Sequence, residues 1–234
     1  MSTIETVLVI GSGSDLAAEL AMQYARQGAR LYLMGRNEVR LKQLESGLAQ
    51  VGACEVHAMQ FDILEYDRFC GLLGSLKHPP DVSIVAVGMM PNDAHSAEVA
   101  QEMMRVNAEA PAMVCERLAA YLSDLQHDSV IIGVSSLAGI RGRASNYAYG
   151  AAKAAFTAYL SGLRNRYYGS SVHIMTVLPG FVRTKMIAKI HTPDFLTVDV
   201  ETLAQRIRTA VNQRRDIVYS LWIWRWIALV FVAI

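Results

Sequence analysis

The sequence predicts an α/β protein with one doubly wound domain, built on a parallel sheet of seven strands. Short runs rich in β-branched residues alternate with longer helix-like stretches from the start of the chain, the pattern of repeated strand–helix–strand units. The 234 residues are enough for one full hydrophobic core and would be cramped as two domains. No internal repeat, low-complexity tract or linker divides the chain.

The first half of the chain holds four of the expected strands. Gly28-Ala29 leads into the second strand, Asn37 is a good N-cap for the helix after it, and the turn His78-Pro79-Pro80 precedes the fourth strand. The expected strands here are Thr6–Ile10, Arg30–Met34, Cys54–Gln60 and Val82–Val87. The expected helices are Leu16–Gln27, the stretch from Asn37 to Gln50, and Asp67–Leu76.

The second half continues the alternation. A long helix is expected first, and Pro179-Gly180 ends the sixth strand, after which a less regular segment runs to about Asp199. The expected strands are Val130–Val134, Val172–Leu178 and Ile217–Tyr219. The expected helices are Ala97–Leu122, Tyr147–Tyr167 and the stretch from about Asp199 to Arg214. We assign residues 1–219 to the domain and 220–234 to an apolar C-terminal segment.

This end of the chain is unusually apolar. The 18 residues Ile217–Ile234 contain Arg225 as their only charge and fall just short of the roughly 20 residues that a spanning helix needs. Because the run stops without a polar cap, we expect the segment to be incomplete. The three tryptophans Trp222, Trp224 and Trp226 favour a membrane surface, since an indole is apolar but carries a polar N–H. A subunit interface or a spanning helix are the alternatives.

Composition narrows the class of protein. Hydrophobic residues make up 53% and charged residues 18%, and the net charge of +1 gives no field to attract nucleic acid. Cys54, Cys70 and Cys115 lack metal-ligand spacing, so we expect no metal site and three free, buried thiols in a reducing compartment. No signal peptide is recognisable. We expect a cytoplasmic homo-oligomer, with peripheral association at the inner face of the membrane as an option.

The first strand ends in the turn Gly11-Ser12-Gly13-Ser14-Asp15. Glycines at this place let the backbone approach a pyrophosphate, whose charge the following helix N-terminus stabilises. Leu16 occupies the last glycine position of the usual dinucleotide motif, so an ordinary tight turn is a real alternative.

A more specific pattern follows the fifth strand. Ser136 lies at the strand end, and Tyr149 and Lys153 share a face of the next helix at a four-residue separation. A phenol has a pKa near 10 and needs a nearby cation to transfer protons at neutral pH. We expect Lys153 to lower the pKa of Tyr149. Separately these residues could be a cap, a surface aromatic and a solvated charge; together they indicate a catalytic centre.

The chain resembles the short-chain dehydrogenase/reductase family from about Thr6 to Tyr219. Tyr149 and Lys153 match the family's YxxxK, Ser136 its serine 13 residues upstream, and Asn107 its asparagine on the long helix. The resemblance implies a Rossmann-like fold and an NAD(P)(H)-dependent oxidoreductase. Tyr147 does not match YxxxK, because the fourth residue after it is Ala151.

The resemblance also implies roles for these residues. Tyr149 would transfer a proton to the nascent alkoxide, Ser136 would bond the carbonyl oxygen, Lys153 would hold the cofactor ribose, and Asn107 would fix a relay water. The segment Pro179-Gly180-Phe181-Val182-Arg183-Thr184 resembles the family's PGxVxT, in which Val182 and Thr184 hold the nicotinamide amide. The full set of expected cofactor contacts is Gly11, Ser12, Gly13, Ser14, Asp15, Leu16, Arg36, Asp62, Ile63, Gly88, Tyr149, Lys153, Pro179, Gly180, Val182 and Thr184.

Two motifs depart from the family. Asp15 and Ala17 replace the second and third glycines of TGxxxGxG, and Asp15 is expected to cap the helix. The family's NNAG is replaced by Val85-Ala86-Val87-Gly88. Both departures, with the aromatic C-terminus, resemble the subgroup of decaprenylphosphoryl-2-keto-arabinose reductases, which suggests a lipid-linked keto-sugar as substrate.

The leading hypothesis is therefore a carbonyl reductase or alcohol dehydrogenase acting on a small-molecule or lipid-linked substrate. We expect NADP(H) to be preferred over NAD(H), because Arg36 after the second strand can pair with a 2′-phosphate, whereas an acidic residue would repel it. Asp62 and Ile63 should flank the adenine. Met186, Ile187, Ile190 and Phe195 could line the substrate site or simply pack in the core. A nucleotide-binding regulator without turnover and a membrane scaffold are the competing hypotheses.

Overall fold

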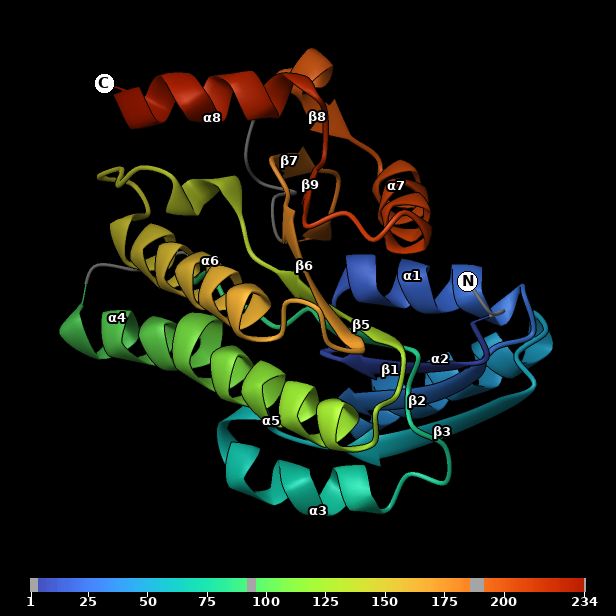
Figure 1. Ribbon diagram of the computed structural model, residues 1–234. Coiled ribbons are helices and arrows are strands. Elements are labelled where there is room, and N and C mark those ends of the chain that lie inside the picture. The colour runs from blue at the N-terminus through green and yellow to red at the C-terminus, as the bar shows by residue number, and fades with distance from the viewer. Residues whose placement is uncertain (1–3, 92–95, 186–191, 234) are drawn as a thin grey trace.

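A computed structural model describes residues 4–91, 96–185 and 192–233 of the chain. Seven parallel strands form one sheet in the order β3-β2-β1-β4-β5-β6-β9 (Figure 1), which confirms the predicted fold class. The strands are β1 (Thr6–Ile10), β2 (Arg30–Gly35), β3 (Glu55–Gln60), β4 (Val82–Val85), β5 (Ser129–Val134), β6 (Val172–Leu178) and β9 (Ile217–Tyr219). The strand order reverses between β1 and β4, and ligands bind such sheets at the carboxyl ends beside this point.

Helices cover both faces of the sheet. One face packs against α1 (Asp15–Ala25), α2 (Glu38–Gln50) and α7 (Val200–Asn212). The other face packs against α3 (Phe69–Gly74), α5 (Ala110–Asp124) and α6 (Tyr147–Arg166). Because side chains alternate along a strand, Val7 and Val9 enter the first core, whereas Leu8 and Ile10 enter the second. Burial on both faces explains why the strands are almost continuously apolar.

The expected long helix is divided into three parts. Figure 1 shows α4 (Ala97–Met104) and α5 joined end to end, and the turn between them, η2 (Arg105–Glu109), is π-helical. The expected helix Asp67–Leu76 is likewise a 3₁₀ segment, η1 (Ile63–Arg68), followed by α3.

The segment after β6 is more regular than expected. β7 (Phe181–Val182) pairs in parallel with β8 (Thr197–Val198), and η5 (Asp194–Leu196) lies just before β8.

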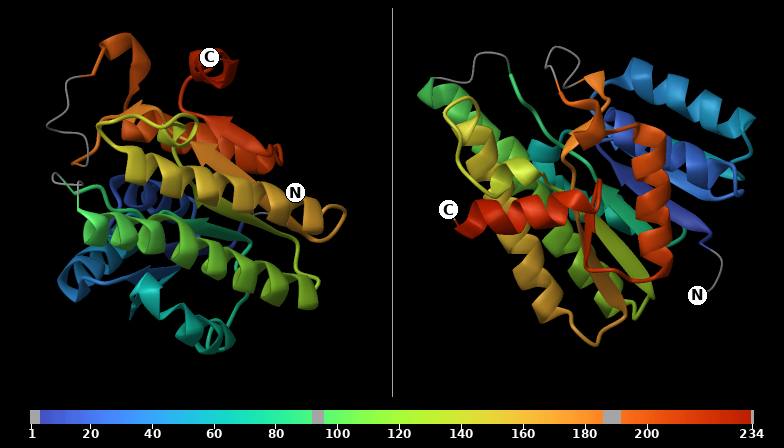
Figure 2. Two further views of the ribbon diagram at one scale, coloured as in Figure 1. Left: turned by 90° about the vertical axis from the view of Figure 1, so that its left-hand side faces the viewer. Right: turned by 90° about the horizontal axis from the view of Figure 1, so that it is seen from above.

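The apolar C-terminal segment forms α8 (Ile223–Ala233), which lies over the carboxyl edge of the sheet (Figures 1 and 2). Its buried face packs against Leu178 at the end of β6 and against Leu137. Among the residues that the structure describes, no helix combines the length and hydrophobicity needed to cross a bilayer.

The three cysteines do not share one environment. Cys115 is a buried free thiol, as expected. Cys54 and Cys70 are free but exposed, so the expectation of burial was wrong for both. Cys54 follows the turn before β3, and Cys70 lies on the outer side of α3, where the core does not reach.

Candidate active site

A cavity of about 540 Å³ lies at the carboxyl edge of the sheet. Its walls come from the turn after β1, the loops after the next four strands of the chain, α6, the β7 segment and α8. This is the position at which doubly wound sheets bind ligands. The cavity therefore marks the part of the molecule where chemistry is expected.

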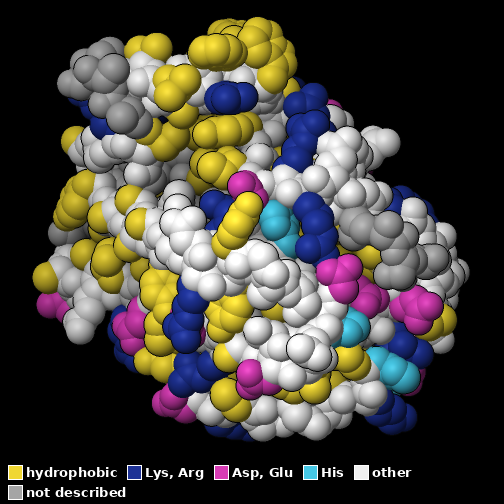
Figure 3. Space-filling view, in the orientation of Figure 1, with side chains coloured by type: hydrophobic (Ala, Val, Ile, Leu, Met, Phe, Trp, Pro, Cys, Tyr) yellow, Lys and Arg dark blue, Asp and Glu magenta, His cyan; other side chains and the backbone are white. Residues whose placement is uncertain are grey.

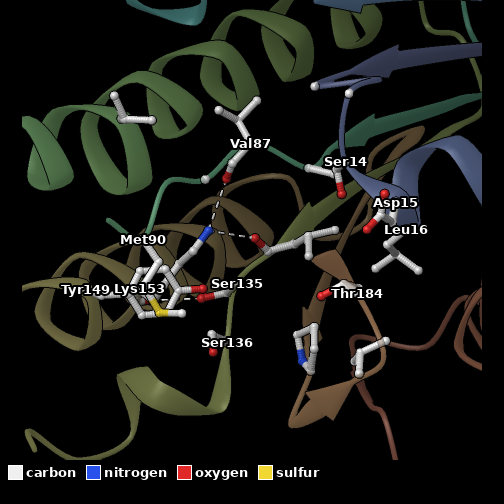
Figure 4. A pocket seen from close by; sticks show the side chains of 18 of the residues that line it. Ser14, Asp15, Leu16, Val87, Met90, Ser135, Ser136, Tyr149, Lys153 and Thr184 are labelled. Atoms are coloured by element: carbon white, nitrogen blue, oxygen red, sulfur yellow. Dashed lines mark hydrogen bonds between the residues drawn. The ribbon is translucent and has the colours of Figure 1, made fainter. Parts of the chain in front are cut away.

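Three of the expected catalytic residues line this cavity. Ser136 follows β5 and begins the short helix η3 (Leu137–Gly139), where its Oγ accepts a hydrogen bond from the Ala138 N–H at 3.1 Å. Tyr149 and Lys153 lie one turn apart on α6. Figure 4 shows them on the opposite side of the cavity from the turn after β1. Tyr147, which does not match the motif, is 48% exposed, whereas Tyr149 is 9% exposed, so the helix directs only Tyr149 inward.

The Lys153 ammonium is almost completely buried. It donates hydrogen bonds to the carbonyl oxygens of Val87 at 3.2 Å and Val134 at 3.1 Å (Figure 4), and so connects the chain after β4 to the end of β5. Burial lowers the pKa of Lys153 to about 8, because the charged form loses its hydration. A cation with this pKa changes charge close to physiological pH.

The Tyr149 hydroxyl differs from the expectation. Burial raises the pKa of Tyr149, and a hydrogen bond with Ser136 lowers it by less. Lys153 Nζ lies 6.0 Å from the centre of the Tyr149 ring and is directed at the two carbonyl oxygens. Lys153 therefore does not lower the pKa of Tyr149 as expected, because its ammonium donates its hydrogen bonds to backbone carbonyl oxygens. A raised pKa keeps Tyr149 protonated at neutral pH, the state from which it can donate a proton.

Asn107 lies behind the cavity wall and does not line the cavity. It is fully buried in the π-helical turn, where its Oδ1 accepts from the Met89 N–H and its Nδ2 donates to the Met89 carbonyl, both at 2.9 Å. Gly88 separates it from Lys153: a Cβ on Gly88 would lie 2.9 Å from Asn107 Oδ1 and 3.5 Å from Lys153 Nζ. Asn107 thus fixes the loop after β4, in which Gly88 leaves room for the lysine.

The turn after β1 forms a cradle that only glycine permits at its first position. Gly11 has φ +84°, and a Cβ there would lie 2.7 Å from the Ala86 carbonyl oxygen. The N–H groups of Gly11 and Ser12 donate to the Met34 carbonyl, as does Ser12 Oγ at 3.2 Å, so Ser12 lies behind the wall. The residues of the turn that face the cavity are Gly11, Gly13, Ser14, Asp15 and Leu16.

Asp15 binds across the cavity mouth instead of capping the helix. Ser14 is the N-cap of α1, and Asp15 Oδ2 accepts from the Lys185 N–H at 2.8 Å. Its Oδ1 lies 3.5 Å from Arg40 Nη2 and 3.7 Å from Lys185 Nζ. The two cations neutralise the carboxylate that stands at a family glycine position, and the contact joins α1 to the segment after β7.

The remaining expected cofactor contacts also line the cavity. Arg36 follows β2 and is exposed, and Asp62 caps η1 by accepting from the Leu64 N–H at 3.0 Å. The others at the cavity wall are Ile63, Gly88, Pro179, Gly180, Val182 and Thr184. A glycine cradle, a helix N-terminus and a basic side chain suit the pyrophosphate and phosphate groups of a dinucleotide, so the residues present fit the expected cofactor.

The sequence missed several residues of the wall. Trp224 was expected at a membrane surface, but it is 7% exposed and lines the cavity, so that expectation was wrong. Met90, Phe181 and Arg143 also line it. Spacing within the uniformly apolar C-terminal run could not distinguish the one inward tryptophan. Phe195, expected as substrate lining, is 75% exposed and away from the cavity, and Met186, Ile187 and Ile190 lie outside the described residues.

Comparisons with known proteins place the chain among short-chain dehydrogenases and related oxidoreductases. The family model described as short chain dehydrogenase matches residues 5–194. An uncharacterized oxidoreductase of Mycobacterium tuberculosis is 31% identical over 222 residues, covering 92% of this chain and 88% of the relative. An uncharacterized oxidoreductase of Escherichia coli is 29% identical over 198 residues, covering 78% of this chain and 75% of the relative.

Solved structures share the fold over nearly the whole chain. A short-chain dehydrogenase from Sphingobium yanoikuyae in complex with NADPH superposes with a TM-score of 0.84 at 24% identity, covering 97% of this chain and 92% of the other. A short-chain dehydrogenase from Burkholderia cenocepacia in complex with NADP gives 0.81 at 23% identity, with 97% and 92% covered. The chain therefore belongs to the short-chain dehydrogenase/reductase family and is an NAD(P)-dependent oxidoreductase.

Proposed function

We propose that this protein reduces a ketone, or oxidises the corresponding secondary alcohol, with Ser136, Tyr149 and Lys153 as its catalytic centre. The observation that carries the proposal is that these three side chains, expected from the sequence, line one cavity together with the glycine cradle after β1. A non-catalytic regulator would need the cradle but not the buried tyrosine and lysine.

The residues perform complementary tasks. Ser136 Oγ donates a hydrogen bond to the carbonyl oxygen and stabilises the negative charge that develops on it. Tyr149, held protonated by burial, passes its proton to that oxygen. Lys153 would hold the ribose hydroxyls of the cofactor. When bound, the nicotinamide supplies or accepts the hydride.

Replacing Tyr149 tests this mechanism most directly. Tyr149→Phe removes only the transferable proton, so steady-state oxidation of NADPH with a ketone panel should fall by about 100-fold or more while NADPH affinity is retained. The matched control is Tyr147→Phe, on the same helix but exposed, which should be nearly silent. Normal turnover of Tyr149→Phe would exclude the mechanism, and absent turnover of the unaltered protein with NADPH bound would favour the regulator.

The proposed cofactor is NADP(H) in preference to NAD(H). Arg36 lines the cavity just after β2, where the adenosine ribose lies in this fold, and its guanidinium can bind a 2′-phosphate with two hydrogen bonds. Asp62 and Ile63 would flank the adenine. The structural neighbours solved with NADPH and NADP are consistent with this choice.

Equilibrium binding decides the preference. NADPH should bind more tightly than NADH, and Arg36→Ala should weaken NADPH by about 10-fold or more while leaving NADH almost unchanged. Arg26→Ala, an exposed arginine at the end of α1, is the control and should alter neither. Equal affinities in the unaltered protein would refute the preference.

We also propose that the outer face of α8 brings the enzyme to a membrane surface, where a lipid-linked carbonyl substrate would be found. Trp226 is 58% exposed on α8, as are Arg225, Leu229 and Val230, and Trp222, in the turn just before the helix, is 73% exposed. Figure 3 shows apolar side chains gathered over this end of the molecule. Indoles beside an arginine suit the headgroup region, and the opposite face of α8 walls the cavity.

Sedimentation with vesicles of phosphatidylcholine and phosphatidylglycerol tests this association. The unaltered protein should sediment with them, and a Trp222→Ser/Trp226→Ser variant should not. Tyr168→Ser, which removes a 91% exposed aromatic after α6, should sediment normally. If the protein stays in the supernatant and light scattering shows a dimer that the double variant loses, the face contacts a second copy and the lipid proposal fails.

A further inference from the structure

The indole of Trp224 packs directly onto Gly180. A Cβ added to Gly180 would lie 2.3 Å from Trp224 Cε2 and 2.4 Å from its Nε1, far inside contact distance. The φ angle of Gly180 is not in the left-handed region, so its backbone would accept a side chain. The tryptophan, rather than backbone strain, therefore requires glycine at this position.

Three further contacts fix the indole. Its Nε1 donates to the Leu196 carbonyl at 3.3 Å, and its ring meets Phe181 edge-on at 5.6 Å between centroids. Leu137 packs in the same apolar cluster. The side chain is thus held by the β7 segment, by η5 and by η3, and it behaves as a fixed wall.

This wall lies at the catalytic end of the cavity. Leu137 directly follows Ser136, and Gly180 belongs to the segment expected to hold the nicotinamide. Met90 and Phe181 add further apolar surface to the cavity. A carbonyl compound bound to Ser136 and Tyr149 would have its other groups enclosed by this surface.

We propose that Trp224 is a specificity-determining residue, whose indole limits the size of the apolar group beside the carbonyl that Ser136 and Tyr149 receive. The inference rests on the proposed ketone chemistry. It extends that proposal by assigning the substrate end of the cavity to α8, and by giving Gly180 the task of making room for the indole.

The test compares kcat/KM for a small ketone, cyclohexanone, with that for a larger one, 2-decalone. Trp224→Ala should shift the ratio towards 2-decalone by about 10-fold or more, because the removed indole leaves space there. NADPH affinity should stay within about twofold, which also verifies folding. Trp224→Phe keeps an aromatic ring in place and should shift the ratio by less. Trp222→Ala, which removes an exposed tryptophan from the turn just before α8, should not shift the ratio.

A second experiment tests the contact itself. Gly180→Ala should lower Tm and ketone turnover in the unaltered background, and much of the Tm loss should disappear in Gly180→Ala/Trp224→Ala. If the unaltered protein reduces ketones but Trp224→Ala and Trp224→Phe leave the ratio unchanged, the inference is wrong and the proposed function stands. If neither ketone is reduced while NADPH binds, the proposed function and the inference resting on it both fail.

Discussion

Lys153 is a cation that folding removes almost completely from water. Its pKa is 10.5 as a free side chain and about 8 in the folded protein, so below pH 8 the folded state must hold a buried charge. Between pH 8 and pH 10.5 the unfolded chain binds more protons than the folded one, and the free energy of unfolding rises with pH. The total rise in the free energy of unfolding from this group is roughly 3 kcal/mol at most.

Comparison with Lys153→Met isolates the contribution of Lys153 to the pH dependence of stability. The stability of the unaltered protein minus that of the variant should increase from pH 8 to pH 10.5, measured by urea unfolding at several pH values. A difference that stays flat over this window would show that the ammonium remains hydrated. A fall with pH would mean that its folded pKa is raised, opposite to the effect of burial.

Ser135 and Ser136 are neighbours with different partners. Ser135 Oγ lies 2.9 Å from the Lys153 carbonyl and 2.6 Å from Thr157 Oγ1, so it braces α6. Ser135→Ala should lower stability by about 1–2 kcal/mol and reduce kcat less than tenfold. Ser136→Ala removes the bond from the Ala138 N–H and should lower stability by about 1 kcal/mol, but it should reduce kcat by about 100-fold. Thermal unfolding and NADPH oxidation on both variants check this, and interchanged effects would reverse the assignment.

The π-helical turn η2 is the element that places Asn107. Its amide satisfies both backbone groups of Met89, so Asn107→Ala should leave a buried donor and acceptor unpaired and lower stability by about 2–4 kcal/mol. Asn107→Asp keeps the acceptor but loses the donor, and its stability should lie between that of the unaltered protein and that of Asn107→Ala. Urea unfolding measures the losses; a loss below about 0.5 kcal/mol in the alanine variant would show that the loop is fixed by other contacts.

The strands were predictable because each is a short, doubly buried apolar run between turns. Ser136, Tyr149 and Lys153 were predictable because a strand end and one helical turn determine their positions locally. The π-helical turn was not, since Arg105–Glu109 has an ordinary helical composition and its partner Met89 is distant in sequence. The role of Trp224 was hidden for a related reason: the contrast between the faces of α8 comes from Gly180 and Leu137, not from its own apolar pattern.

The cavity joins most of the domain at one edge of the sheet. Because its walls come from the carboxyl ends of the strands β1 to β6, a bound cofactor should stabilise the whole molecule. NADPH at roughly a hundred times its Kd should contribute about 2.7 kcal/mol to stability, equivalent to a rise in Tm of about 5–10 °C. NADH at equal concentration should give a smaller rise, and Tyr149→Phe should keep the NADPH effect. A Tm that NADPH does not move would contradict cofactor binding at this cavity.

The π-helical turn also bears on how the length of the chain can vary. A turn closed by i→i+5 bonds, such as that from the Ala110 N–H to the Arg105 carbonyl, contains one residue more than an α-helical turn. Together α4 and α5 therefore correspond to one helix with a single inserted residue. Deleting one residue within Arg105–Glu109 would restore α-helical spacing and rotate one half of the helix by about 100° against the other. In an alignment of related chains, a one-residue gap at this place should mark those that have lost the hydrogen bonds between the Asn107 amide and the Met89 backbone. Gaps between other helices and strands would leave these bonds intact.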